Sequence, residues 1–440
     1  PGLSDGRQRV YGDPMPLQLD GGGSRQPVDP RRRRGEVGLP QAAQHTGHAD
    51  GVDDPAASAL AHHLPGYRLG AQKGPPQLSS QHGLSAVAAM TLDGTSATLL
   101  CCGKDGIPSG PALMYNDARA TKQAQHVAGL APSDCAAHGP SASLAKLLWL
   151  LQTGSCNQAG HCLHQADWLL GRLCGQFGFS DENNALKLGY DVIQRCWPDW
   201  LHALDIPMHL LPEVVPAGQP VGALAEPWCD RWGLSRDTRV LAGTTDSTAS
   251  FIATGARPGE AVTSLGSTLV LKVMAEQPVF APQDGVYSHR LGDRWLVGGA
   301  SNSGGAVLRQ YFTDDDIARH TAQMDIATPT GLDYYPLPAT GERFPVNDPG
   351  QAPRLQPRPD DDARFFQGIL EGIAVIEHEG YRKLAALGAP WPTRIITTGG
   401  GASNEPWRTM RAHLNDIPVT AAAHQDAAYG TALLARKGST

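Results

Sequence analysis

The segment RVLAGTTDSTASF, residues 239–251, decides the fold class. Its apolar run, Val240 to Ala242, predicts a short buried strand, and the small residues that follow predict a turn with Asp246 at the start of a helix. An acidic side chain at the carboxyl end of a strand lies where α/β sheets bind their ligands, and it can accept a proton from a hydroxyl. Taken alone, an Asp before a helical run is more often an N-cap, so the rest of the sequence has to decide between these interpretations.

Strands and helices alternate on both sides of this segment. Downstream, EAVTSLGSTLVLKV at residues 260–273 predicts a hairpin, because a Gly-centred turn separates two β-branched runs. Upstream, LSAVAAMTL and ATLLCC at residues 84–102 predict a second hairpin around the turn DGTS. Apolar periodicity predicts helices near residues 144–151, 168–173, 362–387, 407–414 and 427–436, and strands in RIITT and IPVTAAA. This alternation predicts an α/β fold with two similar domains.

Composition divides the chain into three parts. Residues 1–84 are rich in Pro, Gly, Arg, Gln and His without sustained apolar periodicity, so we expect a poorly packed, disordered or out-of-frame segment. The Pro and Gly residues of EVVPAGQPVGAL, residues 213–224, predict a connector. It separates a domain at residues 85–222 from a domain at residues 223–440.

Length and charge exclude several classes of protein. A chain of 440 residues and 46.6 kDa is long enough for two domains. The net charge of -7 and pI near 6.1 do not suit a nucleic-acid partner. No window has the ~20 apolar residues of a membrane span, so we expect no membrane partner and a soluble, cytoplasmic protein.

The eight cysteines show no paired metal-binding spacing, and we expect them to be reduced thiols. Cys156, His161, Cys162 and His164 form the one cluster that suggests a metal site. Their spacing matches no zinc pattern, and the Leu and Trp residues around them favour an amphipathic helix. We therefore assign no metal-ligating residue.

Two Gly-containing turns could bind phosphate. TSLGST, residues 263–268, offers backbone amides and hydroxyls at Gly266, Ser267 and Thr268, although an ordinary hairpin turn has the same pattern. TTGGGASN, residues 397–404, follows a strand and opens a helix, so Gly399, Gly400, Gly401 and Asn404 could lie along a nucleotide. Neither turn matches the Rossmann or P-loop pattern.

Two further turns carry polar groups suited to polyol hydroxyls. DGTSAT contributes Asp93, Thr95 and Ser96, and YNDAR contributes Asn116, Asp117 and Arg119. A solvated loop is an equally good interpretation of YNDAR taken alone.

Seven motifs in order resemble those of FGGY-family carbohydrate kinases, over about residues 84–436. They are the run from DGTSATLL to YNDARA, SDENNALKLGYD, AGTTDSTASF, TSLGSTLVLK, YYPLPATGERFP, TTGGGASNEPWRTMR and DAAYGTALLA. In detail they are most similar to the D-ribulose or xylulose kinase-like branch.

The resemblance implies an actin-like, ribonuclease-H-like fold of two domains with the ligand cleft between them, and ATP-dependent phosphorylation of a small ketose. Asp246 would be the catalytic base, with ATP and Mg²⁺ as cofactors. Asp93, Thr95, Ser96 and YNDAR would lie on the sugar side, and the two Gly-containing turns would bind the nucleotide. The sequence leaves open whether the chain forms a homodimer.

One family feature is missing from residues 1–85. FGGY kinases open with a strand and a D-x-G-T-S phosphate loop, which SDGRQR at residues 4–9 does not supply. Three functions therefore remain: an active ketose kinase, a truncated or degraded kinase that binds sugar or nucleotide without turnover, and an actin-like ATPase. The motifs SDENN and YNDAR favour the first two.

Overall fold

The computed structural model describes residues 87–439, and the chain is α/β throughout that range. The expectations for residues 1–84, including the missing phosphate loop, lie outside the described residues. In residues 87–439, no helix combines the length and apolar character needed to cross a membrane.

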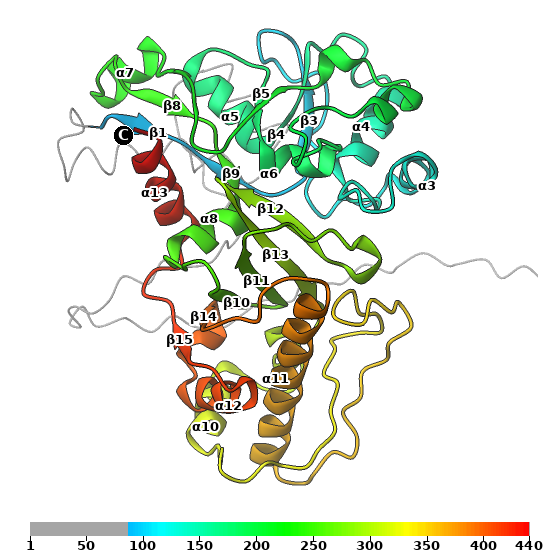
Figure 1. Ribbon diagram of the computed structural model, residues 1–440, viewed down its shortest axis with the longest axis vertical. Helices are drawn as coiled ribbons and strands as arrows, with labels where there is room; N and C mark the ends of the chain where they lie inside the picture. The colour runs from blue at the N-terminus through cyan, green and yellow to red at the C-terminus, as the bar shows by residue number, and fades with distance from the viewer. Residues whose placement is uncertain (1–86, 440) are drawn as a thin grey trace, which may run out of the picture. The chain divides into compact units, whose positions relative to one another are not determined.

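A six-stranded mixed sheet is the main element of the second half of the chain (Figure 1). The strand order is β12-β13-β11-β10-β14-β15. The sheet pairs β10 with β11 antiparallel, which confirms the predicted hairpin at residues 260–273, and β10 with β14 parallel. The strands are β10 (Ala261–Leu265), β11 (Leu269–Ala275), β12 (Tyr287–Leu291), β13 (Arg294–Ser301), β14 (Ile395–Thr398) and β15 (Val419–Ala421).

One face of this sheet packs against α11 (Asp362–Ala386), the predicted long helix. Strand residues alternate between faces, so Thr263 and Leu271 point to the same side. Thr263 bonds Glu377 and Tyr381 of α11, and Gly380 leaves room for Leu271, which a Cβ would approach to 2.4 Å. Helix α12 (Glu405–Asn415) adds Arg411 to this core.

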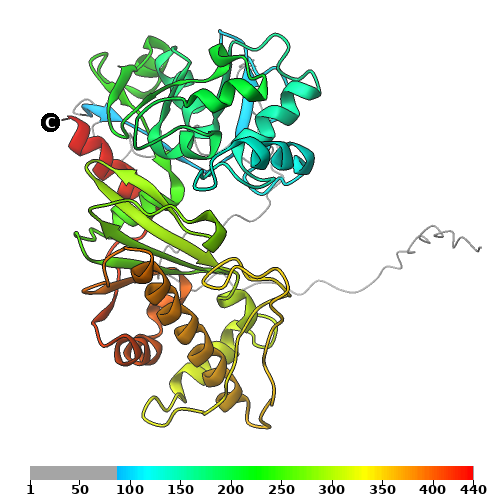
Figure 2. The same ribbon diagram turned by 45° about the vertical axis from the view of Figure 1, so that its right-hand side comes forward.

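The opposite face packs against α8 (Asp246–Ala253), and α8 in turn packs against α13 (Ala427–Ser439) (Figures 1 and 2). The apolar cluster that joins α8 to the sheet consists of Phe251, Val262, Met274, Leu296 and Ile396. Helices α8 and α13 approach closely because Gly430 has no side chain: a Cβ there would lie 1.8 Å from the Ala249 carbonyl oxygen. The start of α8 is thus held above one face of the sheet.

The first half of the described chain contains four small sheets, ordered β1-β8-β7, β2-β9, β3-β4 and β5-β6. Its strands are β1 (Ala89–Met90), β2 (Asp93–Gly94), β3 (Leu99–Cys102), β4 (His161–His164), β5 (Phe179–Asp181), β6 (Glu213–Val215), β7 (Pro220–Ala223), β8 (Arg239–Leu241) and β9 (Thr244–Thr245). Its helices are α3 (Thr121–Leu130), α4 (Ser143–Gln152), α5 (Gln165–Cys174), α6 (Glu182–Ala185) and α7 (Glu226–Trp232).

Shorter elements complete the described residues. The 3-10 helices are η2 (Leu186–Leu188), η3 (Asp199–Leu204), η4 (Met208–Leu210), η5 (Pro282–Asp284) and η6 (Gly400–Ser403). Two α-helices lie between β13 and α11, namely α9 (Gly305–Leu308) and α10 (Asp314–Ala322).

Four expectations are wrong in detail. The upstream hairpin does not form, because β1 pairs with β8 and β3 pairs with β4. The expected connector at residues 213–224 contains strands β6 and β7. Residues 161–164 form a strand, and helix α5 starts only at Gln165. Cys101 and Cys156, whose Cα atoms are 5.7 Å apart, form a disulfide and are not reduced thiols.

Candidate active site

Asp246 is the first residue of α8, directly after β9. The N-cap position belongs to Thr245, so the capping interpretation of Asp246 is not the one that the structure adopts. Its Oδ1 accepts a hydrogen bond of 2.6 Å from the backbone N–H of Ser247. Burial raises the pKa of Asp246 above its ordinary value of 3.8, and the nearby Asp93 carboxylate adds to the rise. A carboxylate with a raised pKa suits proton abstraction.

A pocket of about 190 Å³ separates the start of α8 from the sheet. Asp246 lines it from α8, and Lys272 lines it from β11. Thr398, the residue before the Gly399 turn, lines it from β14. The pocket therefore joins the candidate base to the edge of a candidate nucleotide loop.

The two Gly-containing turns lie against each other. Gly399 has φ +81°, and a Cβ there would lie 2.6 Å from the Leu265 carbonyl oxygen, so glycine is needed for this approach. A third turn, at residues 303–305, contacts the TSLGST turn through a 2.9 Å hydrogen bond from Gly305 N–H to the Gly266 carbonyl.

This arrangement leaves backbone amides available. The amides of Ser267, Thr268, Gly400 and Gly401 make no hydrogen bond within the part of the chain that the structure describes. Adjacent amides of this kind form anion-binding concavities.

Asn404 plays a structural role at this site. It is the N-cap of α12, where its Oδ1 accepts from the Trp407 N–H at 2.9 Å. Its Nδ2 donates to Thr321 Oγ1 at 3.1 Å. Both ends of the amide already have protein partners, so Asn404 fixes the path of the loop.

On the expected sugar side, the structure brings Asp93 toward Asp246. Asp93 pairs with Thr244 in the parallel β2–β9 ladder, and its Oδ2 accepts from Thr431 Oγ1 at 2.7 Å. The turn that follows is held by Gln165, whose Oε1 accepts from both the N–H and the hydroxyl of Thr95. Ser96 is the next residue and is partly exposed.

The YNDAR turn is tied to the same region by Lys146. Its ammonium donates to the carbonyls of Ala97 and Met114 at 2.8 Å each, which joins the DGTSAT and YNDAR turns. Asn116 is exposed. Asp117 pairs with Arg119 at 2.8 Å, and this pairing holds the pKa of Asp117 below its usual value although burial acts to raise it.

Sequence reasoning missed three lysines of this region: Lys146, Lys187 and Lys272. Burial lowers the pKa of Lys146 to about 8, and Lys187 lies within electrostatic range of both Lys146 and Asp246. Lys146 interrupts the apolar helix SLAKLLWLL, which was a usable signal. Lys187 lies within SDENNALKLGYD, but its role was not separated from that of the motif.

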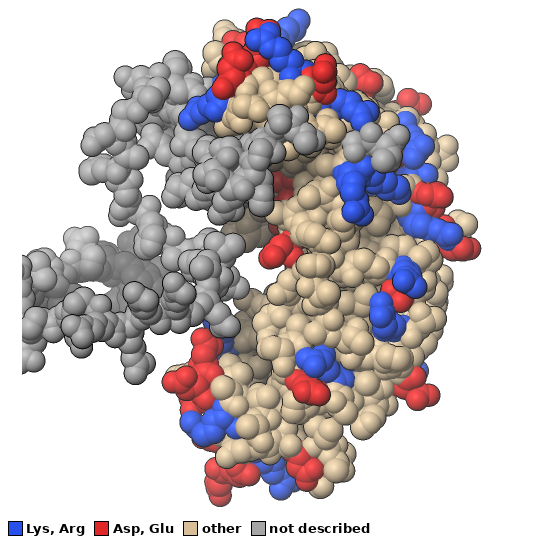
Figure 3. All heavy atoms as spheres, turned by 90° about the vertical axis from the view of Figure 1, so that its left-hand side faces the viewer, with Lys and Arg blue, Asp and Glu red and all other residues tan. Residues whose placement is uncertain are grey.

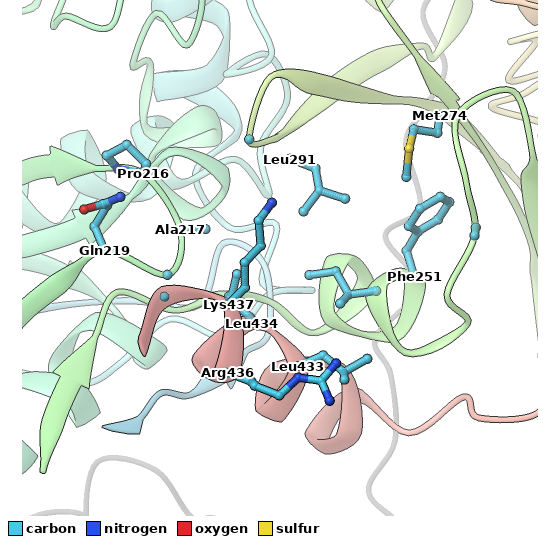
Figure 4. Close-up of a pocket in the computed structure, with 15 residues that line it drawn as sticks. Pro216, Ala217, Gln219, Phe251, Met274, Leu291, Leu433, Leu434, Arg436 and Lys437 are labelled. Carbon is cyan, nitrogen blue, oxygen red and sulfur yellow. The ribbon is translucent and has the colours of Figure 1, made fainter. Parts of the chain in front are cut away.

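Two other constellations among the described residues do not provide a competing site. Ser143, His164 and Asp167 form a hydrogen-bonded series, but all three are buried, so no substrate can reach the hydroxyl. A larger cavity of about 700 Å³ lies between α8 and α13 (Figure 4). It is lined mainly by apolar side chains and by Arg436 and Lys437, without a carboxylate, hydroxyl or imidazole group.

The face drawn in Figure 3 carries charged side chains of both signs. There, Lys and Arg side chains of the described residues are interspersed with Asp and Glu. This distribution agrees with the small negative net charge of -7.

Comparison with known proteins identifies the family. Residues 75–253 match the FGGY family of carbohydrate kinases, N-terminal domain, and residues 261–438 match the C-terminal domain. The chain belongs to the FGGY family of carbohydrate kinases. As an FGGY kinase it is a phosphotransferase that uses ATP and acts on an alcohol group of a sugar.

Individual relatives agree with this family. The chain is 28% identical over 360 residues to the xylulose kinase of Escherichia coli K12, covering 77% of this chain and 73% of that protein. A xyloylose kinase from Brucella ovis has a similar structure, with TM-score 0.76 and 22% identity over 83% of this chain and 79% of that one. The structure of Plasmodium falciparum glycerol kinase with ADP is also similar, with TM-score 0.71 and 16% identity over 82% of this chain and 77% of that one. The expected actin-like, two-domain sugar kinase fold is confirmed.

A magnesium ion would have to enter this site with the nucleotide. In residues 87–439, no group of three or more His, Cys, Asp or Glu side chains could hold a metal ion. Magnesium commonly binds through one or two carboxylates together with nucleotide phosphates. Asp93 Oδ1 has no hydrogen-bond partner among the described residues, so it is available to a ligand.

Proposed function

We propose that this FGGY kinase transfers the γ-phosphoryl group of ATP to a small ketose of the D-ribulose or D-xylulose type, with Asp246 as catalytic base. The observation that carries the proposal is the pocket beneath α8. It brings Asp246 within the same cavity as Thr398, at the edge of the Gly399–Gly401 turn. A base at that position can act on a hydroxyl that faces the nucleotide.

The chemical step makes few demands on the protein. The Asp246 carboxylate takes the proton of the sugar hydroxyl as its oxygen forms a bond to the γ-phosphorus, while the bond from that phosphorus to the ADP oxygen breaks. General-base assistance of this kind contributes ~10²- to 10⁴-fold in rate. Asp246 is suited to it because Ser247 N–H fixes one carboxylate oxygen and leaves the other without a partner among the described residues.

The two Gly-containing turns would bind the nucleotide phosphates. The unpaired amides of Ser267, Thr268, Gly400 and Gly401 are the donors that we assign to the nucleotide phosphates. Mg²⁺ bound to those phosphates would neutralise their negative charge.

The sugar class rests on the relatives and on the polar turns. Xylulose kinases are the relatives with 28% and 24% identity over 360 and 384 residues. We assign Asp93, Thr95, Ser96, Asn116, Asp117 and Arg119 to the sugar side because Lys146 and Gln165 hold their two turns in place. These carboxylate, amide and hydroxyl groups suit the hydroxyls of a ketose.

The decisive experiment is a coupled assay of ADP release with D-ribulose, D-xylulose and glycerol as acceptors. We expect Asp246→Ala to abolish ketose-dependent ADP release while ATP affinity stays within a few-fold, because the carboxylate faces the acceptor. Asp237→Ala, which changes an exposed Asp nine residues before the start of α8, is the matched control.

The same assay tests the alternatives. An equal loss of ATP binding in Asp246→Ala would assign Asp246 a metal-binding or structural role. Binding of ketose and nucleotide by the wild-type protein without ADP release would support a kinase homologue that binds without turnover.

A further inference from the structure

Lys272 has an unusual side-chain environment for a lysine. It is 7% exposed, and its ammonium has no hydrogen-bond partner within residues 87–439. Removing an ammonium group from water is costly unless it is paired, so unpaired buried lysines are rare. A charge in this state needs a partner beyond those that the described residues supply.

The strand places this ammonium in the pocket beneath α8. Lys272 follows Leu271 on β11, so it points away from the α11 core and toward α8. Gly298 lies opposite it on β13, where a Cβ would approach the Lys272 Cγ to 3.1 Å. The glycine therefore leaves the space that the lysine stem occupies.

The charged groups around Lys272 come from three other elements. Asp246 of α8 interacts favourably with its ammonium, whereas Lys187 of η2 opposes its charge. His289 of β12 also lies within electrostatic range, and burial lowers its pKa well below the ordinary value, so it is neutral. No ion pair joins Lys272 to Asp246. A single carboxylate at a distance does not satisfy the three donors of an ammonium.

The geometry points to Lys272 as a further catalytic residue: its ammonium binds the γ-phosphoryl group of the nucleotide and stabilises the charge on that group during transfer. This inference rests on the proposed function. Asp246 and Lys272 line the same pocket from the helix side and the sheet side, with Thr398 at the nucleotide end. A phosphoryl group between them would have Asp246, the base for the acceptor hydroxyl, on one side. On its other side, the Lys272 ammonium would contact the phosphoryl oxygens.

The proton balance follows from this placement. The acceptor oxygen forms its bond to the γ-phosphorus as its proton passes to Asp246, the bond from that phosphorus to the ADP oxygen breaks, and Lys272 keeps its proton throughout. Its contribution is electrostatic, and such fixed charges act strongly where water is excluded.

The test compares the wild-type protein with Lys272→Met, which keeps the length of the side chain and removes the charge. Lys122→Met on the exposed side of α3 is the control. We expect kcat for ketose-dependent ADP release to fall ~10²- to 10³-fold in Lys272→Met, with the KM for ketose within a few-fold. Lys272→Arg should restore part of the loss. Unchanged kcat in Lys272→Met would overturn the inference while leaving the proposed function intact.

A binding measurement separates this inference from the proposed function. By calorimetry, wild-type protein should bind a non-hydrolysable ATP analogue more tightly than ADP, and Lys272→Met should remove that preference while ADP affinity stays within a few-fold. A preference that survives in Lys272→Met, or is absent from the wild type, would overturn the inference. If no ketose supports ADP release, the proposed function fails, and the binding comparison still decides the role of Lys272.

Discussion

A partly buried carboxylate and a buried ammonium define the reaction chemistry at the scale of single residues. Burial raises the pKa of Asp246 and lowers the pKa of Lys272 to about 8. Each group partly offsets the desolvation of the other, because the lysine favours the ionised carboxylate and the carboxylate favours the protonated amine. Such perturbed pairs in a pocket are characteristic of functional sites.

The pH dependence of kcat/KM should reflect these two groups. Activity should fall as the pH drops through the raised pKa of Asp246, because a protonated carboxyl cannot accept the acceptor proton. Activity should also fall as the pH rises through about 8, because Lys272 then loses its charge in the free enzyme.

The measurement is a kcat/KM profile for the ketose in wild-type protein and Lys272→Arg. Arginine stays protonated throughout the range, so its profile should lack the fall on the alkaline side. An alkaline fall that is identical in both proteins would assign it to another group.

The sequence could predict some of these residues and not others. Asp246 follows a recognisable strand and turn, so its position at the start of a helix was predictable. The burial of Lys272 was not predictable. A single lysine in the strand LVLKV is typical of a strand with one solvent-exposed face. Only the packing of α8 on that face makes the position buried, and this packing depends on contacts far apart in the chain.

At the scale of elements, predictions succeeded where pairing is local. The hairpin of β10 and β11 joins neighbouring strands through a short turn, and α11 has apolar periodicity along its whole length. The predicted upstream hairpin failed because its strands pair with partners about 60 to 150 residues away. Non-local pairing leaves no pattern in the strand itself, whereas the seven-motif resemblance did indicate the correct family.

The glycine turn at residues 399–401 offers a test of the nucleotide site that does not disturb the fold. A Cβ on Gly400 would meet no atom within 4 Å, whereas one on Gly399 or Gly401 would clash with Leu265. We expect Gly400→Val to fold normally and to weaken ATP and ADP binding, because the side chain occupies space that the nucleotide needs.

The control for this variant is Gly129→Val in α3, where a Cβ likewise meets no atom within 4 Å. Valine in a helix interior changes stability by less than ~1 kcal/mol, so both variants should have near-wild-type melting temperatures. Fluorescence titration with ADP gives the affinities. Wild-type affinity in a folded Gly400→Val protein would remove this turn from the nucleotide site.

At the scale of the whole molecule, the described residues contain two large apolar cores. One comprises residues from Leu99 to Leu211, and the other residues from Ala261 to Trp407. The second core also contains a buried ion pair, in which Arg411 donates to Glu377 at 2.6 Å and 2.5 Å. Both proposed nucleotide turns extend from strands of the second core, whereas the proposed sugar-side turns adjoin the first.

This division predicts two transitions in calorimetric unfolding, because separate cores can unfold as separate units. Arg411→Met should lower only the transition of the second core. The arginine is 0% exposed, and its loss leaves the Glu377 carboxylate buried without its cation, at a cost of ~3–5 kcal/mol.

ADP should raise the same transition, because binding stabilises the unit that holds the ligand. The measurement is differential scanning calorimetry of wild-type protein and Arg411→Met with and without ADP. If ADP raised the transition that Arg411→Met leaves unchanged, the glycine turns at residues 266–268 and 399–401 would not be the nucleotide site.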